Sequence, residues 1–261
     1  MPRNFPRLAR AKLVSVRPMQ EAEPLQQVRR TYIRYRGRTL SYFGGCDYLG
    51  LAWHPEVRAS MRRALAKGPT QTGASRTTTG EHRLYSEVER ALARFFQFPA
   101  AALVSCGYLA PLAAIQSLRT RASAVVLSPD AHSCVRDAAA ASGLRVLHMG
   151  DSRPESLIRC LRRLPKGARP VVATDGTYGI RGGMAPLDGY LRCLPREGWM
   201  LVDDAHGAGV VGPRGRGSVA RFAICDPRVV MTMSLAKALG VSGGAVLAAE
   251  EVIHSVRTAG A

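Results

Sequence analysis

The sequence predicts an α/β protein built around a mainly parallel β-sheet. Short apolar runs alternate along the chain with amphipathic segments of helical period. The apolar runs lack the in-out alternation of a half-exposed sheet, and turn residues bound each of them, which is typical of strands buried on both faces. The 261 residues are 46% apolar and 21% charged, the composition of an ordinary globular protein.

The expected elements follow in chain order. A β-like run at 37–43 precedes a helix over 54–68, which ends at Gly68, and a second amphipathic helix over 81–96. The apolar face of that second helix consists of Leu84, Val88, Leu92 and Phe95. Further apolar runs are predicted as strands at 100–105, 123–128, 144–149, 170–175, 199–204 and 228–234. An Ala-rich helix follows Gly107, and 154–164 has a helical pattern.

Composition also limits the class of partner. The net charge is +18, but arginines supply most of it and are scattered, with no basic run interleaved with aromatics, so we expect no nucleic acid partner. No apolar run is long enough for a membrane span. The six cysteines include no C-x-x-C pair, which favours a reduced, cytoplasmic protein. The basic residues before position 20 only weakly resemble a transit peptide.

The stretch LVDDAHGAGVVG at 201–212 admits two interpretations. Its glycines match a dinucleotide-binding loop, but the PRGRGS that follows is a poor start for the helix that such a loop requires. The glycines are therefore predicted to form an ordinary loop. Asp203 and Asp204 are neighbours that point to opposite faces of an extended strand, so no metal site is expected.

An acid at a strand end with His206 three residues later suits pyridoxal phosphate (PLP), whose ring nitrogen needs a carboxylate partner. PLP also needs a lysine for its Schiff base. Lys12 lies in a basic stretch, Lys67 lies at a helix end, and Lys166 lies in a loop. Only Lys237 follows a buried strand, among small residues.

Other strand ends offer the remaining contacts, because ligands of parallel sheets bind where the strands end. Gly107 and Tyr108 stand at a helix start, where free amides can receive a phosphate, and Ser234 can add a hydroxyl. His132 follows another strand and can stack on a flat ring. Asp175 ends a further strand.

Together these segments resemble the α-oxoamine synthases, which are fold-type I PLP-dependent enzymes. The similarity rests on CDYLGL, TGASRTTTGEHRLYSEVERALARFF, VSCGYLAP, DAHS, ATDGTYGIRGGMAPL, LVDDAHGAGVVGPRGRG and SLAKALGVSGGAVL, in the family's order. The resemblance implies the large domain of a PLP-dependent transferase, with a mainly parallel, seven-stranded sheet flanked by helices. We expect an N-terminal segment at 1–45, this PLP-binding domain at 46–250, and the start of a C-terminal region, short of the family's small domain, at 251–261.

The resemblance also implies the site and the reaction. The catalytic residues would be Lys237, His206, Asp203 and His132; the cofactor-binding residues would be Gly107, Tyr108, His132, Asp175, Asp203, His206, Ser234 and Lys237. The implied reaction condenses an amino acid with an acyl-CoA or acyl-carrier thioester in a homodimer, with an enzyme of biotin biosynthesis, 8-amino-7-oxononanoate synthase, as the leading type. An aminotransferase-type PLP enzyme and a truncated, inactive PLP-binding paralogue are the alternatives.

Four positions depart from the family pattern. The family usually has Asn where Cys46 stands, Ser where Gly179 stands and an acid where Arg181 stands; Asp175 replaces a typical Glu. These differences bear on which amino acid and thioester are used and on efficient catalysis.

Overall fold

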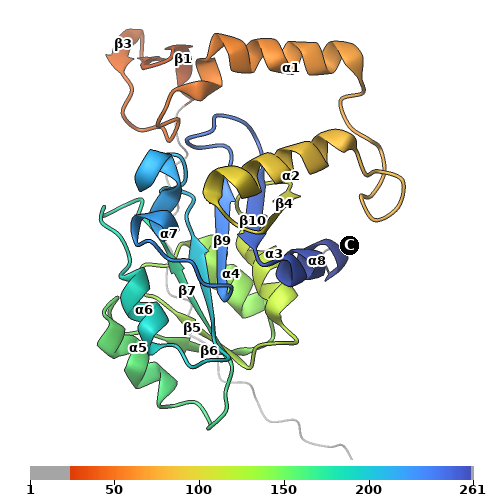
Figure 1. The fold of residues 1–261 in the computed structure, drawn as a ribbon. Coiled ribbons are helices and arrows are strands. Elements are labelled where there is room, and N and C mark those ends of the chain that lie inside the picture. Colours follow the sequence, from red (N-terminus) through yellow and green to blue (C-terminus); the bar gives the residue numbers. More distant parts are fainter. Residues whose placement is uncertain (1–23, 260–261) are drawn as a thin grey trace, which may run out of the picture. The chain divides into compact units, whose positions relative to one another are not determined.

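The computed structural model describes residues 24–259, and Figure 1 shows their elements in colour. The chain divides into two compact units, residues 1–43 and 44–261. The basic N-terminal stretch and Lys12 lie outside the described residues.

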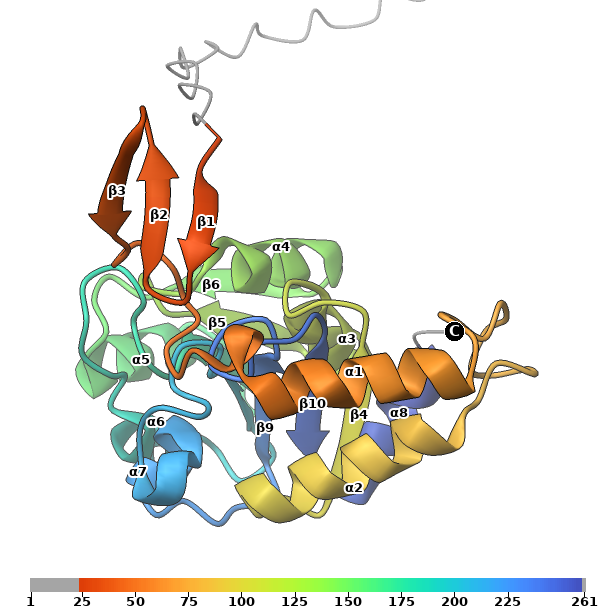
Figure 2. The same cartoon turned by 90° about the horizontal axis from the view of Figure 1, so that it is seen from above.

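The described part of the first unit is a three-stranded antiparallel sheet in the order β1-β2-β3 (Figure 2). Its strands are β1 (Gln26–Arg29), β2 (Tyr32–Tyr35) and β3 (Arg38–Ser41). β3 falls within the predicted run at 37–43. Arg36 and Gly37 form the two-residue turn before it, with positive φ angles of 48° and 75°, as a tight hairpin turn requires.

The second unit is organised by a seven-stranded sheet in the order β4-β10-β9-β8-β7-β5-β6. β10 runs antiparallel to both of its neighbours, and the other paired strands are parallel, so the prediction of a mainly parallel sheet is confirmed. The strands are β4 (Ala100–Val104), β5 (Ala124–Leu127), β6 (Arg145–His148), β7 (Pro170–Asp175), β8 (Trp199–Asp203), β9 (Val229–Ser234) and β10 (Gly244–Ala248).

Helices cover both faces of this sheet. The helices of the second unit are α1 (Pro55–Lys67), α2 (Arg83–Phe96), α3 (Leu109–Leu118), α4 (Ser133–Ala141), α5 (Pro154–Leu161), α6 (Leu187–Cys193), α7 (Gly217–Arg221) and α8 (Glu250–Ala259), with short 3₁₀ turns η1 (Leu51–Trp53) and η2 (Pro213–Gly215). No residue of α1 is buried. α3, α4 and α8 pack on one face, and α2, α5, α6 and α7 on the other (Figure 1). Alternate residues of each strand therefore reach different cores: Met200 and Val202 enter one, and Leu201 the other.

The burial of α2 differs from the simple amphipathic pattern. Of its apolar face only Leu92 is buried; Leu84, Val88 and Phe95 are 40–50% exposed. Glu89 is buried in the helix instead, because two arginines and a backbone N–H surround its carboxylate.

The C-terminal helix α8 belongs to the core of the second unit. Its residues Val252, Ile253 and Val256 are buried in the same cluster as α3 and α4. Among residues 24–259, none of the helices has the length and apolar character needed to cross a membrane.

Candidate functional site

The ends of β7, β8 and β9 bring the predicted acids and Lys237 to one edge of the sheet. Asp175 and Asp203 are the paired last residues of β7 and β8, and Thr232 of β9 pairs with Asp203. Lys237 follows β9 by three residues. Parallel strands thus collect, in one place, side chains that are far apart in the sequence.

Asp203 is a buried carboxylate whose hydrogen-bond donors are neutral. It is 4% exposed, and it accepts from the Thr232 hydroxyl at 3.2 Å and the Cys134 thiol at 3.4 Å. Burial raises the pKa of Asp203, while the charge of Lys237 acts in the opposite direction. A cationic N–H donor on a ligand would stabilise this carboxylate more than the chain's own donors do.

The adjacent Asp204 has a structural role on the opposite face. It accepts from the backbone N–H of Ser218 at 2.7 Å and from the Ser218 hydroxyl. A Cβ at Gly207 or at Gly217 would lie 2.1 Å from an oxygen of this carboxylate. Gly207 is therefore required for packing on Asp204. The loop after Gly212 continues into η2, not into a long helix, and the prediction that these glycines form a loop is confirmed.

His206 lies between Lys237 and a tyrosine that the sequence analysis did not single out. Its Nε2 lies 2.9 Å from Nζ of Lys237, and its Nδ1 lies 2.7 Å from the hydroxyl of Tyr48. Burial, and then the charges of Lys237 and His132, lower the pKa of His206 to about 4. The imidazole is therefore neutral near pH 7, with one donor and one acceptor nitrogen.

Hydrogen bonds connect His132 with two acids, with Asp175 through the His132 backbone and with Asp203 through Cys134. Its backbone N–H donates to Oδ1 of Asp175 at 2.8 Å, and its Nδ1 lies 3.0 Å from Sγ of Cys134. The same thiol donates to Asp203. Burial raises the pKa of Asp175 to about 7. Asp175 thus anchors the segment that carries His132, and Cys134 connects His132 with Asp203.

Gly107 and Ser234 meet at the start of α3. A Cβ on Gly107 would lie 2.6 Å from Cβ of Ser234, and one on Gly244 would lie 2.7 Å from the backbone N of Gly107. Only glycines allow the β4–α3 turn to approach β9 and β10 this closely. The side chain of Tyr108 is committed elsewhere, since its hydroxyl donates to Asp137.

The structure shows the surroundings of the other three positions that depart from the family pattern. A Cβ on Gly179 would lie 2.4 Å from Nε2 of His206, so the usual serine would force the imidazole out of its present position. Arg181 donates to Asp130 at 2.8 and 2.6 Å and lies over the ring of Tyr178. Cys46 is partly exposed and precedes Tyr48 by two residues.

Sequence reasoning missed Tyr48, Cys134 and Thr232. Tyr48 and Cys134 stand within or beside motifs that were noted, CDYLGL and DAHS, but nothing local marks their side chains as neighbours of His206 and Asp203. Thr232 could have been found by its place two residues before the end of a strand next to β8.

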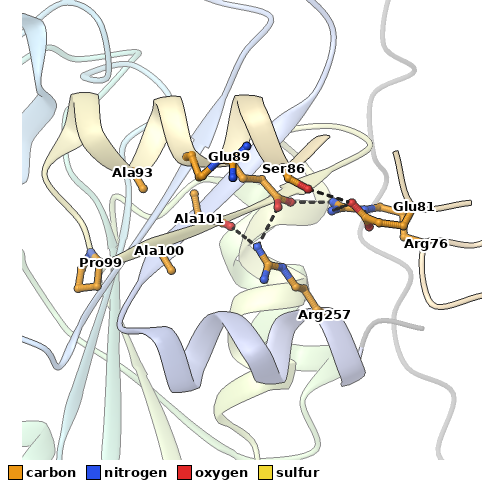
Figure 3. Close-up of a pocket in the computed structure, with 10 residues that line it drawn as sticks. Arg76, Glu81, Ser86, Glu89, Ala93, Pro99, Ala100, Ala101 and Arg257 are labelled. Atoms are coloured by element: carbon orange, nitrogen blue, oxygen red, sulfur yellow. Dashed lines mark hydrogen bonds and ion pairs between the residues drawn. The ribbon is translucent and has the colours of Figure 1, made fainter. Parts of the chain in front are cut away.

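A second polar cluster surrounds a cavity of about 320 Å³ next to α2 and α8. There Glu89 accepts from Arg76 and Arg257, and Figure 3 shows both guanidinium groups directed at it from different segments. Arg76 also pairs with Glu81, so both carboxylates of the cluster are ion-paired within the chain, and the cluster has the character of a structural clamp. Within the part of the chain that the structure describes, no group of His, Cys, Asp or Glu is arranged to hold a metal ion.

The fold agrees with comparison to known families. The chain belongs to the aminotransferase class I and II family, whose model matches residues 43–260. Its relatives include the 8-amino-7-oxononanoate synthase of Nitrosospira multiformis, which is 39% identical over 86% of this chain and 57% of the relative. A putative 8-amino-7-oxononanoate synthase of Caulobacter sp. is 36% identical over 92% of this chain and 63% of the relative.

Solved structures extend the likeness to three dimensions. Serine palmitoyltransferase from S. paucimobilis, with a bound PLP–myriocin aldimine, matches with a TM-score of 0.83 at 28% identity, over 89% of this chain and 59% of that one. The 8-amino-7-oxononanoate synthase from Francisella tularensis shares the fold, with a TM-score of 0.71 at 22% identity over 83% of this chain and 60% of that one. The second unit is thus a large domain of the PLP-dependent fold type I. The chain spans about three-fifths of the length of the curated relatives it matches.

Proposed function

We propose that this chain carries the cofactor site of a PLP-dependent acyltransferase of the α-oxoamine synthase type. The enzyme would condense an amino acid with an acyl-CoA or acyl-carrier thioester, in the manner of 8-amino-7-oxononanoate synthase. The observation that carries the proposal is the position of Lys237, whose Nζ lies 2.9 Å from His206 at the strand edge that also contains Asp203. The similarity to 8-amino-7-oxononanoate synthases supports the reaction type.

The residues present fit PLP. Asp203 is buried with only neutral hydrogen-bond donors, a suitable environment for the protonated nitrogen of a pyridine ring. Gly107 and Ser234 approach each other closely at the start of α3, where backbone N–H groups and one hydroxyl suit a phosphate group. His132, on the segment anchored by Asp175, would pack against the ring.

When bound, PLP supplies an electron-withdrawing ring that stabilises negative charge at the α-carbon of an amino acid. Lys237 would hold the cofactor through its amine and, once displaced by substrate, would accept or return a proton at Nζ. His206 is neutral and in hydrogen-bond reach of that nitrogen. Asp203 would keep the ring nitrogen protonated.

The proposal extends to partners and location. The substrates would be an amino acid and an acyl thioester, and we propose a homodimer, as is usual for the family. The six unpaired cysteines support a cytoplasmic location.

The first test is covalent capture of the cofactor. Purified protein would be mixed with PLP, reduced with borohydride and mapped by peptide mass spectrometry, with Lys237→Ala and the loop variant Lys166→Ala as a matched pair. We expect the label on Lys237 in wild type and in Lys166→Ala, and none at that peptide in Lys237→Ala. Labelling that is equal in all three proteins would contradict the assignment of Lys237.

The second test addresses the reaction. Amino acids would be paired with acyl-CoA thioesters of increasing chain length, and the release of free CoA thiol would be followed. We expect thiol release that depends on both substrates and on Lys237. Transfer of the amino group to a keto acid without thiol release would favour an aminotransferase, and PLP capture without either reaction would favour a non-catalytic PLP-binding protein.

A further inference from the structure

Tyr48 completes a hydrogen-bonded chain that ends at Lys237. The Tyr48 hydroxyl lies 2.7 Å from Nδ1 of His206, and the opposite ring nitrogen, Nε2, lies 2.9 Å from Nζ of Lys237. The two rings are tilted by 53° with their centres 6.2 Å apart, so the contact is made through the hydroxyl and not by stacking.

The segment that carries Tyr48 is packed against both of the loops that carry its partners. A Cβ on Gly240, three residues after Lys237, would lie 2.3 Å from the backbone N of Ala52. A Cβ on Gly209, three residues after His206, would lie 2.8 Å from Cβ of Ala238 and 3.9 Å from Leu49. The tyrosine is therefore held in place by backbone contacts that do not involve its own hydroxyl.

Two arrangements of protons are compatible with this chain of atoms. When Lys237 is an ammonium group it donates to Nε2, so the neutral ring carries its proton on Nδ1 and donates to the oxygen of Tyr48. When Lys237 is a neutral amine it can accept from Nε2–H, and the Tyr48 hydroxyl then donates to Nδ1. A tyrosine hydroxyl serves both cases because it is donor and acceptor.

We propose that Tyr48 is a positioning residue whose hydroxyl, as donor or acceptor, holds the His206 ring in register with Lys237 and links Tyr48 to the Lys237 amine through the imidazole in either tautomer. The use of this link in catalysis rests on the proposed function, whereas the link itself is a property of the protein without cofactor. Gly179 permits this arrangement, since a Cβ at that position would lie 2.4 Å from Nε2 of His206.

The charged and titratable groups near this chain are few. Lys237 and His132 act on His206 through their charges, and Cys46 faces the hydroxyl of Tyr48. Burial and then the contact with Cys46 raise the pKa of Tyr48 to about 12, so the hydroxyl keeps its proton at neutral pH.

The test is ¹⁵N NMR of histidine-labelled, cofactor-free protein, in which the shifts of the two ring nitrogens report the tautomer. His206 would be assigned by loss of its signals in His206→Asn. Tyr48→Phe removes the hydroxyl and keeps the ring; Tyr190→Phe is the control, because the Tyr190 hydroxyl also makes one hydrogen bond, at 2.7 Å to the carbonyl of Ser152.

We expect Tyr48→Phe to shift the signals of both ring nitrogens of His206. Nδ1 loses its hydrogen-bond partner directly, and Nε2 shifts because the ring loses the bond that holds it in register with Lys237, a weakening of roughly fivefold for one ordinary hydrogen bond. Both signals in Tyr190→Phe should match those of wild type. An unchanged Nε2 signal in Tyr48→Phe would overturn the proposal. Failure of PLP to label Lys237 would instead overturn the proposed function and leave this result standing, because the NMR measurement uses no cofactor.

Discussion

Two carboxylates in the second unit are almost equally buried but are surrounded in opposite ways. Glu89 is 3% exposed and Asp203 is 4% exposed. Glu89 accepts from Arg76 at 2.7 Å, from Arg257 at 2.8 Å and from the backbone N–H of Leu103 at 2.9 Å (Figure 3). Asp203 accepts only longer bonds, from a hydroxyl and a thiol.

Under the proposed function, this difference in hydrogen-bond partners distinguishes a structural clamp at Glu89 from a binding site at Asp203. Glu89 joins α2 to the loop that carries Arg76, to β4 and to α8, and its charge is fully matched by the chain. Burial of the Asp203 carboxylate costs desolvation free energy that its neutral neighbours offset poorly. A site that binds a cationic ligand would differ from a structural ion pair in this way. Removing the charge should therefore have opposite effects at the two positions.

The largest expected effect is at the clamp. Glu89→Ala leaves two guanidinium groups and a backbone N–H without their acceptor, and we expect a loss of about 3 kcal/mol in the free energy of unfolding, measured with urea. The side chains of Arg76 and Arg257 are 30% and 49% exposed and can recover some hydration, which holds the loss to the lower end of the usual range.

Glu81→Ala is the matched control. Glu81 also pairs with Arg76, but its side chain is 47% exposed, and such pairs contribute about 0.5 kcal/mol. If the two variants lost the same stability, Glu89 would not be the centre of the cluster.

A second prediction uses the pH dependence of an acid at the strand edge. Burial raises the pKa of Asp175 from 3.8 to about 7, so between these values the folded protein binds a proton that the unfolded chain does not. The stabilisation that Asp175 provides is thus fully present below about pH 4 and is lost as the pH rises towards 7. Asp175→Asn does not titrate, and its stability relative to wild type should rise by about 2 kcal/mol from pH 5 to pH 7.

Urea unfolding at several pH values measures the free energy of unfolding of Asp175→Asn relative to wild type. The contributions of the other titrating acids cancel in this difference because both proteins contain them. Asp188→Asn is the control, because Asp188 lies in a more exposed pair with Arg192 and its pKa is lowered, not raised. A relative stability of Asp175→Asn that stays flat or falls over this range would show that Asp175 is ionised throughout.

The smallest effect is expected at Asp203 itself. Asp203→Asn removes a poorly compensated charge and keeps the shape of the side chain, so the cofactor-free protein should be more stable by about 1 kcal/mol at pH 8. Glu89→Gln, the same chemical change at the clamp, should instead destabilise the protein. The affinity of Asp203→Asn for PLP, followed by absorbance, should fall. A loss of stability in Asp203→Asn without cofactor would break the contrast between the two carboxylates.

Local sequence patterns predicted those features of the molecule that depend only on residues close together in the sequence. Buried apolar runs predicted six of the seven strands of the second unit, all but β10, and the alternation of side chains along a strand predicted that Asp203 and Asp204 would point apart. The scarcity of lysine led to Lys237, since only one lysine follows a buried strand. The interpretation of residues 207–212 as a loop also came from local evidence, the proline and glycines where a helix was required.

The burial of α2 shows where such patterns fail. Its apolar residues predicted one face, yet Glu89 is buried while Leu84 and Phe95 are half exposed. The reason lies in Arg76, from the loop before α2, and in Arg257 of α8, which supply the charges that make burial of a carboxylate tolerable. Arg257 is 168 positions away, so no local segment around Glu89 shows both partners.

By itself, the sequence determined the order of strands and helices, the residues at the strand ends and the resemblance to α-oxoamine synthases, because these depend on period, spacing and residue type within short segments. Only the tertiary structure decided which of those residues touch. It brought Tyr48 to His206, 158 positions away, and Cys134 to Asp203, 69 positions away. Hydrogen bonds depend on distance in space, and it is the sheet, through its strand order and register, that determines which distant segments end side by side.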